Sequence, residues 1–264
     1  TNVIEAVQLM TALTSFRHAT IEQMIRRGAS RSLIEATVED DRRLLEFALT
    51  MEDHARRYKL NGKAKRPVDL RGMVPSIVFT PDALDLVKGS AGNRRRAVDA
   101  LGSQVNANYD VILRDYERVL RHKNRLLKDE ASDALVDSID EMLVTCGAQL
   151  TCYRHALLDR LTPHMIASYE GISGNRESLT CVFTPSWEAK TPSGSGPRVE
   201  VAYTRDSVRE ALSRALGERR ADERARKRAL VGPHADGISF MLDDMDASCF
   251  GSQGQQRSIV LSCK

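Results

Sequence analysis

A long stretch with heptad-like apolar spacing, from Arg94 to Tyr169, constrains the fold of this chain more than any other feature. No proline interrupts it before Pro163. Its first part carries apolar residues on one helix face. After the polar break "KDEASDA", the second part spaces them alternately three and four residues apart, as in the seam of a coiled coil. The first series is Tyr109, Leu113, Tyr116, Leu120 and Leu127, and the second is Leu135, Ile139, Met142, Cys146, Leu150, Tyr153, Leu157 and Leu161.

Two such helices joined by a short polar turn predict an antiparallel helical hairpin that projects as an arm. The second helix, of about 30 residues, would extend roughly 45 Å. An ordinary pair of helices in a bundle is the alternative that the same pattern allows.

Short runs typical of strands lie on both sides of this helical stretch. Before it are "SLIEATVE", "RLLEFALT" and "RRYKL", and the last is followed by Asn61-Gly62, which predicts a tight hairpin turn. "SIVFTP" (76–81) is predicted to be a buried strand. After the helical stretch come "SLTCVFTP" (178–185), "RVEVAY" (198–203) and "ISFMLDDMDASCF" (238–250), in which Asp243 and Asp244 form a surface turn. "SWEAKTPSGSGP" between the first two is a polar connector.

Two further segments have helical patterns. "TNVIEAVQLMTAL" opens the chain and could be capped by Thr1 or Asn2. "DSVREALSRALGERRADERARKRAL" (206–230) could be capped by Asp206 or Ser207. The β-rich halves on either side of the arm would have to meet in space to complete one core.

Composition excludes several classes of protein. Aromatic residues are only 5% of the chain and charged residues are 28%, which favours a helix-rich, solvated structure. The apolar runs are far shorter than the roughly 18–20 residues of a membrane span, so we expect a soluble protein with no membrane contact. The five cysteines have no CxxC spacing, which argues against a disulfide framework and a zinc site and favours inert thiols in a reducing cytosol.

The formal net charge is only +3, but the basic residues come in runs such as 94–96 and 226–228. Each run is either a solvated helix face or a contact for a polyanion.

The closing segment "FGSQGQQRSIVLSCK" holds a polar loop that runs directly into an apolar stretch. If a helix starts near Gln255, its free amides could bind a phosphate, Ser252 could donate its hydroxyl, and Gly254 would leave room for the ligand. A polar loop that merely caps the helix has the same composition, and the physics alone favours this simpler interpretation.

Specific sequence motifs decide between the phosphate-binding loop and the simple helix cap. "GSQGQQRS", with "LVGPH" some twenty residues earlier, closely resembles the RecF family of DNA repair proteins, which belongs with the SMC proteins among ABC-type ATPases. The resemblance extends to "VFTPDALDLVKGSAGNRRRAVD" (78–99), to "YERVLRHKNRLLK" (116–128) and to the opening "TNVIEAV", so it covers nearly the whole chain.

This resemblance implies an α/β fold with an ABC-type ATPase head that is split in sequence by an inserted antiparallel helical arm. The expected parts are the N-terminal lobe of the head (1–90), the arm (91–175) and the C-terminal part of the head (176–264). A complete member should also have a P-loop before Thr1 and a Walker B strand after Lys264, so the chain is expected to lack both ends of its ATP site.

The resemblance also assigns a site. Ser252, Gln253, Gly254 and Gln255 would form the signature loop, which binds the γ-phosphate of ATP held by a second subunit. Thr1 would be the magnesium-binding hydroxyl of the P-loop, so ATP and Mg are the expected cofactors. The full-length protein would be a weak ATPase, and this chain alone is expected to be inactive.

One departure from the family concerns "GPHADG", where the family usually has Arg-Asp-Asp after "GPH". Ala235 and Gly237 therefore put the contact of that arginine in doubt. His234 could contact a ligand or be a structural histidine, and we favour the structural role.

The implied function is ATP-dependent binding of single- and double-stranded DNA at gaps and junctions, by a homodimer that ATP closes. The implied partners are RecR and RecO, and the outcome is the loading of RecA in recombinational repair and the SOS response, in the bacterial cytoplasm at the nucleoid. An SMC-like ATPase of different duty and a non-catalytic interaction module remain the alternatives. Charge clustering suggests contacts to DNA from Lys59, Lys63, Lys65 and Arg66 on the predicted hairpin and from Arg94, Arg95 and Arg96 at the root of the arm.

Overall fold

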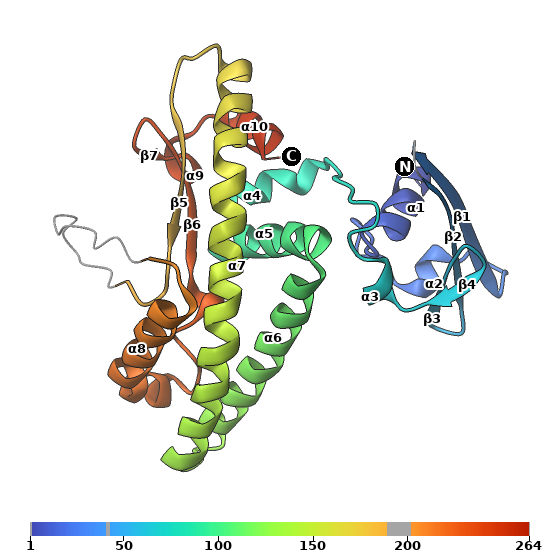
Figure 1. Ribbon diagram of the computed structural model, residues 1–264. Helices are drawn as coiled ribbons and strands as arrows, with labels where there is room; N and C mark the ends of the chain where they lie inside the picture. Colours follow the sequence, from blue (N-terminus) through green and yellow to red (C-terminus); the bar gives the residue numbers. More distant parts are fainter. Residues whose placement is uncertain (1, 41–42, 189–201, 264) are drawn as a thin grey trace. The chain divides into compact units, whose positions relative to one another are not determined.

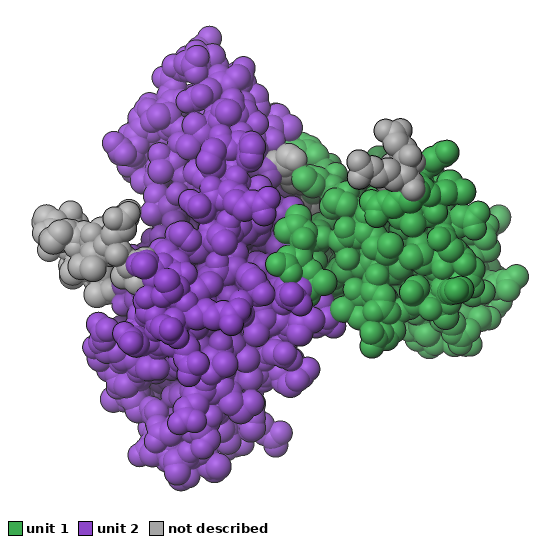
Figure 2. All heavy atoms as spheres, in the orientation of Figure 1, with its two compact units in different colours: residues 1–80, 103–107 green, residues 81–102, 108–264 purple. Residues whose placement is uncertain are grey.

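The computed structural model describes residues 2–40, 43–188 and 202–263 (Figure 1). The chain divides into two compact units, coloured separately in Figure 2. Unit 1 comprises residues 1–80 and 103–107, and unit 2 comprises residues 81–102 and 108–264. Unit 2 therefore combines most of the predicted arm with the predicted C-terminal part of the head. The division into residues 1–90, 91–175 and 176–264 stays a prediction.

Unit 1 is built on a four-stranded antiparallel sheet in the order β1-β2-β3-β4. Its strands are β1 (Arg31–Asp40), β2 (Arg43–Glu52), β3 (Ala55–Leu60) and β4 (Lys63–Lys65). Short helices α2 (Ile21–Met24) and α3 (Pro67–Leu70) flank it in sequence, and α1 (Asn2–Thr11) packs on β1 and β2. The predicted strands 32–60 and the opening helix are confirmed.

Alternation fixes the register of this sheet, because every second residue of β2 points to the same face. Phe47, Leu49 and Met51 are buried there with Tyr58 of β3 and Leu9 of α1. The predicted turn joins β3 to β4, and both of its residues, Asn61 and Gly62, have positive φ. This is the conformation that a two-residue hairpin turn requires.

The prediction of a buried strand at "SIVFTP" is wrong. Residues 75–80 have no regular structure, and the side chains of Ile77 and Phe79 are 53% and 51% exposed. An apolar run becomes a strand only where another strand offers its edge, and no described strand pairs with this one.

Unit 2 contains the predicted helical hairpin. After η1 (Pro81–Leu84) and α4 (Asp85–Lys88) the chain enters α5 (Ala91–Val105), whose last residues belong to unit 1. Helix α6 (Ala107–Lys128) and helix α7 (Asp133–Ser173) follow, joined by a polar turn (Figure 1). The antiparallel hairpin is confirmed, but α7 has 41 residues rather than about 30. It includes Pro163 and ends at Gly174, which adopts the left-handed conformation.

The predicted seam of α7 is rotated from the buried face. Leu135 and Met142 are more than half exposed, whereas Leu143 and Ala148 are buried. The reason is a third helix, α8 (Arg205–Arg226), which packs along α7. A helix with neighbours on two sides buries a wider stripe than the single seam of a two-stranded coil. The core against α6 and α8 includes Ile139, Leu143, Val144, Ala148 and Leu150.

A three-stranded antiparallel sheet in the order β5-β6-β7 completes unit 2. It consists of β5 (Leu179–Thr184), β6 (Gly237–Leu242) and β7 (Met245–Asp246), with the short helix η2 (Pro233–Ala235) before β6. Helices α9 (Ala247–Phe250) and α10 (Gln253–Ser262) close the chain. The predicted Asp243–Asp244 turn is present, and both residues have positive φ.

The predicted strand "RVEVAY" and the predicted cap of the helix after it are not found as expected. Residues 198–201 of the predicted strand "RVEVAY" and most of the polar connector before it lie outside the described residues, and the described end of that run is not a strand. Helix α8 is capped by Thr204, whose hydroxyl accepts from the Ser207 amide, rather than by Asp206 or Ser207. Among the described residues, no helix is both long enough and apolar enough to cross a membrane.

We predict that Leu143→Ala lowers the free energy of unfolding by about 2–5 kcal/mol, because it leaves a cavity at a fully buried position. Leu135→Ala is the matched control on the same helix, and its side chain is 54% exposed. It should change stability by less than about 0.5 kcal/mol. Denaturant titration of both variants measures the change in the free energy of unfolding. Equal losses in the two variants would contradict the assignment of Leu143, rather than Leu135, to the buried face of α7.

Candidate nucleotide-binding site

The predicted signature loop lies at the N-terminus of α10. Ser252 is the N-cap residue, and its hydroxyl oxygen accepts a hydrogen bond from the Gln255 amide at 3.3 Å. The Gln255 side chain accepts in turn from the Ser252 amide at 2.6 Å, which completes a capping box. The loop therefore caps the helix, as the simpler interpretation of the sequence predicted. No described residue accepts the proton of the Ser252 hydroxyl, so this group can donate to a ligand.

The loop keeps unused donors at a position that suits an anion. No described residue accepts from the backbone amides of Gln253 and Gly254. These are the first amides of the helix, at its positive dipole end. A Cβ on Gly254 would meet only the Ser252 hydroxyl, at 3.9 Å, so the space above the loop is open. Ser252, Gln253 and Gly254 are exposed.

The helix behind the loop is anchored firmly. Gln256 is buried, and its side-chain amide donates to the carbonyls of Ala247 and Gly251 at 3.0 and 2.9 Å. Three and four residues further along the chain, Ile259 and Val260 are buried in the core beside α7 and β6. The loop therefore presents its amides from a rigid base.

A hollow of about 370 Å³ lies beside the first turn of α10. It is formed by the end of α7, the segment after it and α10 itself. Gln255 donates through its side-chain amide to the carboxylate of Glu177. Arg176 supplies a cation to the same hollow, and Ser258 lines its helical side.

The second motif, "LVGPHADG", is a structural crossing point inside unit 2. Gly232 has φ +134°, and a Cβ there would lie 2.4 Å from the Tyr116 hydroxyl, so only glycine fits. His234 Nε2 lies 3.2 Å from the Ala229 carbonyl, which can only accept, so Nε2 carries the proton. His234 Nδ1 then accepts from the Tyr116 hydroxyl at 2.6 Å. This geometry favours the structural role of His234.

Burial lowers the pKa of His234 to about 4, against the opposing hydrogen bond to the Ala229 carbonyl and the charge of Glu223. The imidazole is therefore neutral at physiological pH. The two departures from the family pattern, Ala235 in η2 and Gly237 at the start of β6, have no polar side-chain atoms and so make no side-chain hydrogen bond.

Arg154 of α7 joins the motif to the root of the arm. Its guanidinium donates to both carboxylate oxygens of Asp99 at 3.0–3.1 Å, to Asp236 at 3.0 Å and to the Pro233 carbonyl at 2.8 Å. Burial opposes the charge on Arg154, but Asp99 and Asp236 outweigh it and raise the pKa of Arg154. Burial raises the pKa of Asp236 to about 6, although Arg154 works in the opposite direction.

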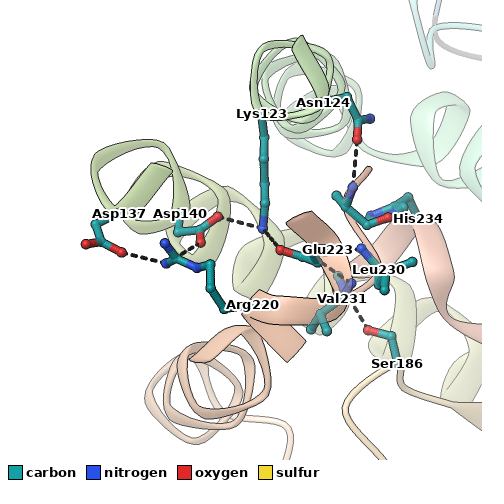
Figure 3. Close-up of polar contacts among 12 residues, drawn as sticks. Lys123, Asn124, Asp137, Asp140, Ser186, Arg220, Glu223, Leu230, Val231 and His234 are labelled. Carbon is teal, nitrogen blue, oxygen red and sulfur yellow. Dashed lines mark hydrogen bonds and ion pairs between the residues drawn. The ribbon is translucent and has the colours of Figure 1, made fainter. Parts of the chain in front are cut away.

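A second buried cluster joins helices α6, α7 and α8 (Figure 3). Lys123 of α6 is fully buried and contacts Glu223 of α8 at 2.5 Å and Asp140 of α7 at 2.7 Å. Glu223 also accepts from the amides of Leu230 and Val231, at 2.7 and 3.4 Å. The start of the second motif is thereby tied to all three helices.

The sequence analysis did not identify either cluster, but a signal was present. Lys123 follows Tyr116 and Val119 on the apolar face of α6, and Arg154 occupies a buried position of α7. A charged residue on an apolar helical stripe indicates a buried ion pair, because an unpaired buried charge is too costly.

The structure places the first group of DNA-binding candidates on two faces of one hairpin. Lys59 lies opposite Ala64, whereas Lys63 and Lys65 lie opposite Leu60 and Tyr58. Residues directly opposite share a face, so Lys59 projects from the other face of the sheet. Arg66 is exposed and pairs with Asp69 at 3.0 Å.

In the second group, Arg94 and Arg95 are half-buried and have partners within unit 2. Arg94 donates to the carbonyls of Val87 and Gly89, and Arg95 donates to the Asp236 carbonyl. Only Arg96 is exposed, and it donates to the Asn93 side chain. The structure therefore gives Arg94 and Arg95 internal partners.

Thr1, the predicted magnesium ligand, lies outside the described residues. Among the residues that are described, no group of three or more His, Cys, Asp or Glu side chains is arranged to hold a metal ion.

Comparison with known proteins gives a consistent result. The DNA replication and repair protein RecF of Thermosynechococcus vestitus is 34% identical over 269 residues, covering 100% of this chain and 68% of the relative. RecF of Kineococcus radiotolerans is 34% identical over 281 residues, covering 100% and 70%. RecF of Geotalea daltonii is 31% identical over 265 residues, again covering 100% and 70%. No model of a protein family matches the chain.

Solved structures agree on the fold. The recombination mediator protein RecF-ATPrS of the RecFOR pathway matches with a TM-score of 0.88 at 24% identity, covering 99% of this chain and 69% of that one. RecF-ATP of the same pathway matches with a TM-score of 0.82 at 23% identity, with the same coverage. The expected α/β fold with an inserted helical hairpin is confirmed.

The fold and the sequence similarity over the whole chain are thus those of a DNA replication and repair protein. More particularly, the chain belongs to the RecF family.

We predict that the cost of His234→Gln depends on pH. In the unfolded chain the imidazole takes up a proton near its ordinary pKa of about 6.5, whereas the folded wild type resists protonation down to a pKa of about 4. The wild type therefore loses stability as the pH falls below about 6.5, and the variant lacks this loss. The stability gap between them should shrink by about 2 kcal/mol from about pH 7 to about pH 5.

Denaturant titrations at the two pH values measure this gap, and the contribution of Asp236 cancels because both proteins contain it. His122→Gln is the matched control, since His122 is exposed on α6. A gap that does not change with pH would contradict the buried neutral imidazole.

Proposed function

We propose that this protein binds DNA in an ATP-dependent manner at gaps and single-strand to double-strand junctions, as a homodimer that ATP closes. The observation that carries the proposal is the loop 252–255, which offers a hydroxyl proton and two free amides at the start of a firmly anchored helix. These are the donors that a triphosphate requires. Two of the solved structures with a similar fold are RecF-ATPrS and RecF-ATP.

The nucleotide is capped in trans. The 264 residues contain no G-x-x-x-x-G-K-[ST] motif, so the loop is not the element that cradles the phosphates. The loop would instead bind the γ-phosphate of an ATP held by the second subunit, and the hydroxyl of Thr1 would there be a ligand of the magnesium ion that accompanies the nucleotide. Loss of the γ-phosphate on hydrolysis would remove the group that Ser252 and the two amides bind, and the dimer would then open.

This design suits a slow switch that times DNA binding. In our proposal the closed dimer acts with RecO and RecR to load RecA at the junction. DNA contacts come from exposed cations of the hairpin, Lys59, Lys63, Lys65 and Arg66, and from Arg96. Arg94 and Arg95 support these contacts by holding the root of the arm.

The substitution Ser252→Arg in the full-length protein tests the clamp. The long cationic side chain fills the open space above the loop and removes the hydroxyl donor. A hydrogen bond to a charged group is worth about 1.5–3 kcal/mol, so ATP-dependent dimerisation should weaken at least about tenfold. Sedimentation with ATP measures dimerisation, and fluorescence anisotropy measures binding to a gapped duplex.

Ser213→Arg on the exposed surface of α8 is the control, because it adds the same charge away from the loop. It should leave both properties unchanged. If dimerisation and junction binding both survive Ser252→Arg, the clamp is wrong and a non-catalytic interaction module is favoured.

A further inference from the structure

The outer face of α6 carries a regular row of cations. Arg114, Arg118, Arg121, Arg125 and Lys128 alternate steps of four and three residues, so all five project from one face of the helix. The side chains of Arg118, Arg121 and Arg125 are 71–82% exposed. Successive cations are spaced roughly 5 Å apart along the axis, and the row is about 21 Å long.

The fold adds a second basic segment to this row. Helix α8 ends at Arg226, and Lys227 turns the chain with φ +52°. The Ala229 amide then donates to the Asn124 side chain of α6 at 2.7 Å (Figure 3). Residues 226–228 are therefore brought to the side of α6 from about a hundred positions further along the sequence. Arg226 and Arg228 are exposed.

The charge balance of this surface is positive. Each of the four arginines of the row has an acidic partner on or just beyond α6: Asp110, Asp115, Glu117 or Asp129. Lys227 pairs with Glu130. In the part of the chain that the structure describes, Lys128, Arg226 and Arg228 form no ion pair. Exposed pairs of this kind contribute little to stability, so the paired cations can exchange their partners for phosphates.

The composition of the face indicates the kind of partner. Every exposed position of α6 from Arg114 to Lys128 is charged or histidine. Protein interfaces have an apolar or aromatic centre, and this face offers none. Cations repeated along a line instead match the phosphates of a nucleic acid backbone, which guanidinium groups bind as forks.

We propose that the outer face of α6, together with residues 226–228, is a second DNA-contact surface, which binds the phosphate backbone of duplex DNA along the arm. This surface is separate from the hairpin cations and the arm root considered above. The proposal rests on the proposed function, since it specifies where the DNA of the junction extends.

The triple variant Lys128→Glu/Arg226→Glu/Arg228→Glu tests it in the full-length protein. These three cations have no acidic partner to lose, so the fold should be retained, and circular dichroism checks this. The probe is a duplex with a single-stranded gap, titrated with ATP at several salt concentrations. Each lost phosphate contact lowers the slope of log affinity against log salt by about 0.9, so the slope should fall by about 2 to 3.

The matched control is Arg160→Glu/Arg209→Glu/Arg214→Glu, which reverses the same number of exposed cations elsewhere in unit 2. It should leave the slope unchanged. The neutral variant Lys128→Gln/Arg226→Gln/Arg228→Gln loses the same three phosphate contacts, so its slope should also fall by about 2 to 3, and it serves as the test if the glutamate variant does not fold.

An unchanged slope in a folded triple variant, or an equal fall in the control, would overturn the proposal and leave the surface to an acidic protein partner. That outcome leaves the proposed function standing, because the wild type would still bind the gapped duplex in an ATP-dependent manner. A wild type that binds no DNA with ATP would overturn the proposed function and this inference together.

Discussion

The structure of unit 2 depends on the guanidinium of Arg154. It is 2% exposed and lies between Asp99 of α5 and Asp236 beside β6, with the Pro233 carbonyl as a third partner. Each charge on its own would be very costly to bury, and together they satisfy one another. The consequence is geometric: α5, α7 and the loop before β6 are fixed relative to one another by a bidentate contact that a lysine could not replace.

A second buried charge extends this fixed body along the arm. Lys123 joins Asp140 and Glu223, and Glu223 also holds the amides at Leu230 and Val231. The segment from 229 to 236 is therefore held at its start by hydrogen bonds from the Leu230 and Val231 amides to Glu223 and at its end by the ion pair of Asp236 with Arg154. It leads through β6 and α9 into the loop 252–255.

The sequence predicted those features that local patterning determines. Alternation in β2 and the Asn61-Gly62 turn determined the first sheet, and the absence of proline with a polar break determined the hairpin. Features that depend on distant partners were not predictable. The buried face of α7 is set by α8, and "SIVFTP" has no described strand beside it. The partners of Lys123 and Arg154 lie far away in sequence. The role of the loop came from its resemblance to a family, because its geometry alone is that of a helix cap.

The central claim is that the loop 252–255 caps a nucleotide held by another subunit. Hydrogen exchange of the Gln253 and Gly254 amides tests it most directly, because no described residue protects them. The measurement compares the full-length protein with and without ATP at a low and a high protein concentration. Our account predicts that ATP protects these amides and that protection increases with protein concentration. Absence of protection, or protection independent of concentration, would contradict capping in trans.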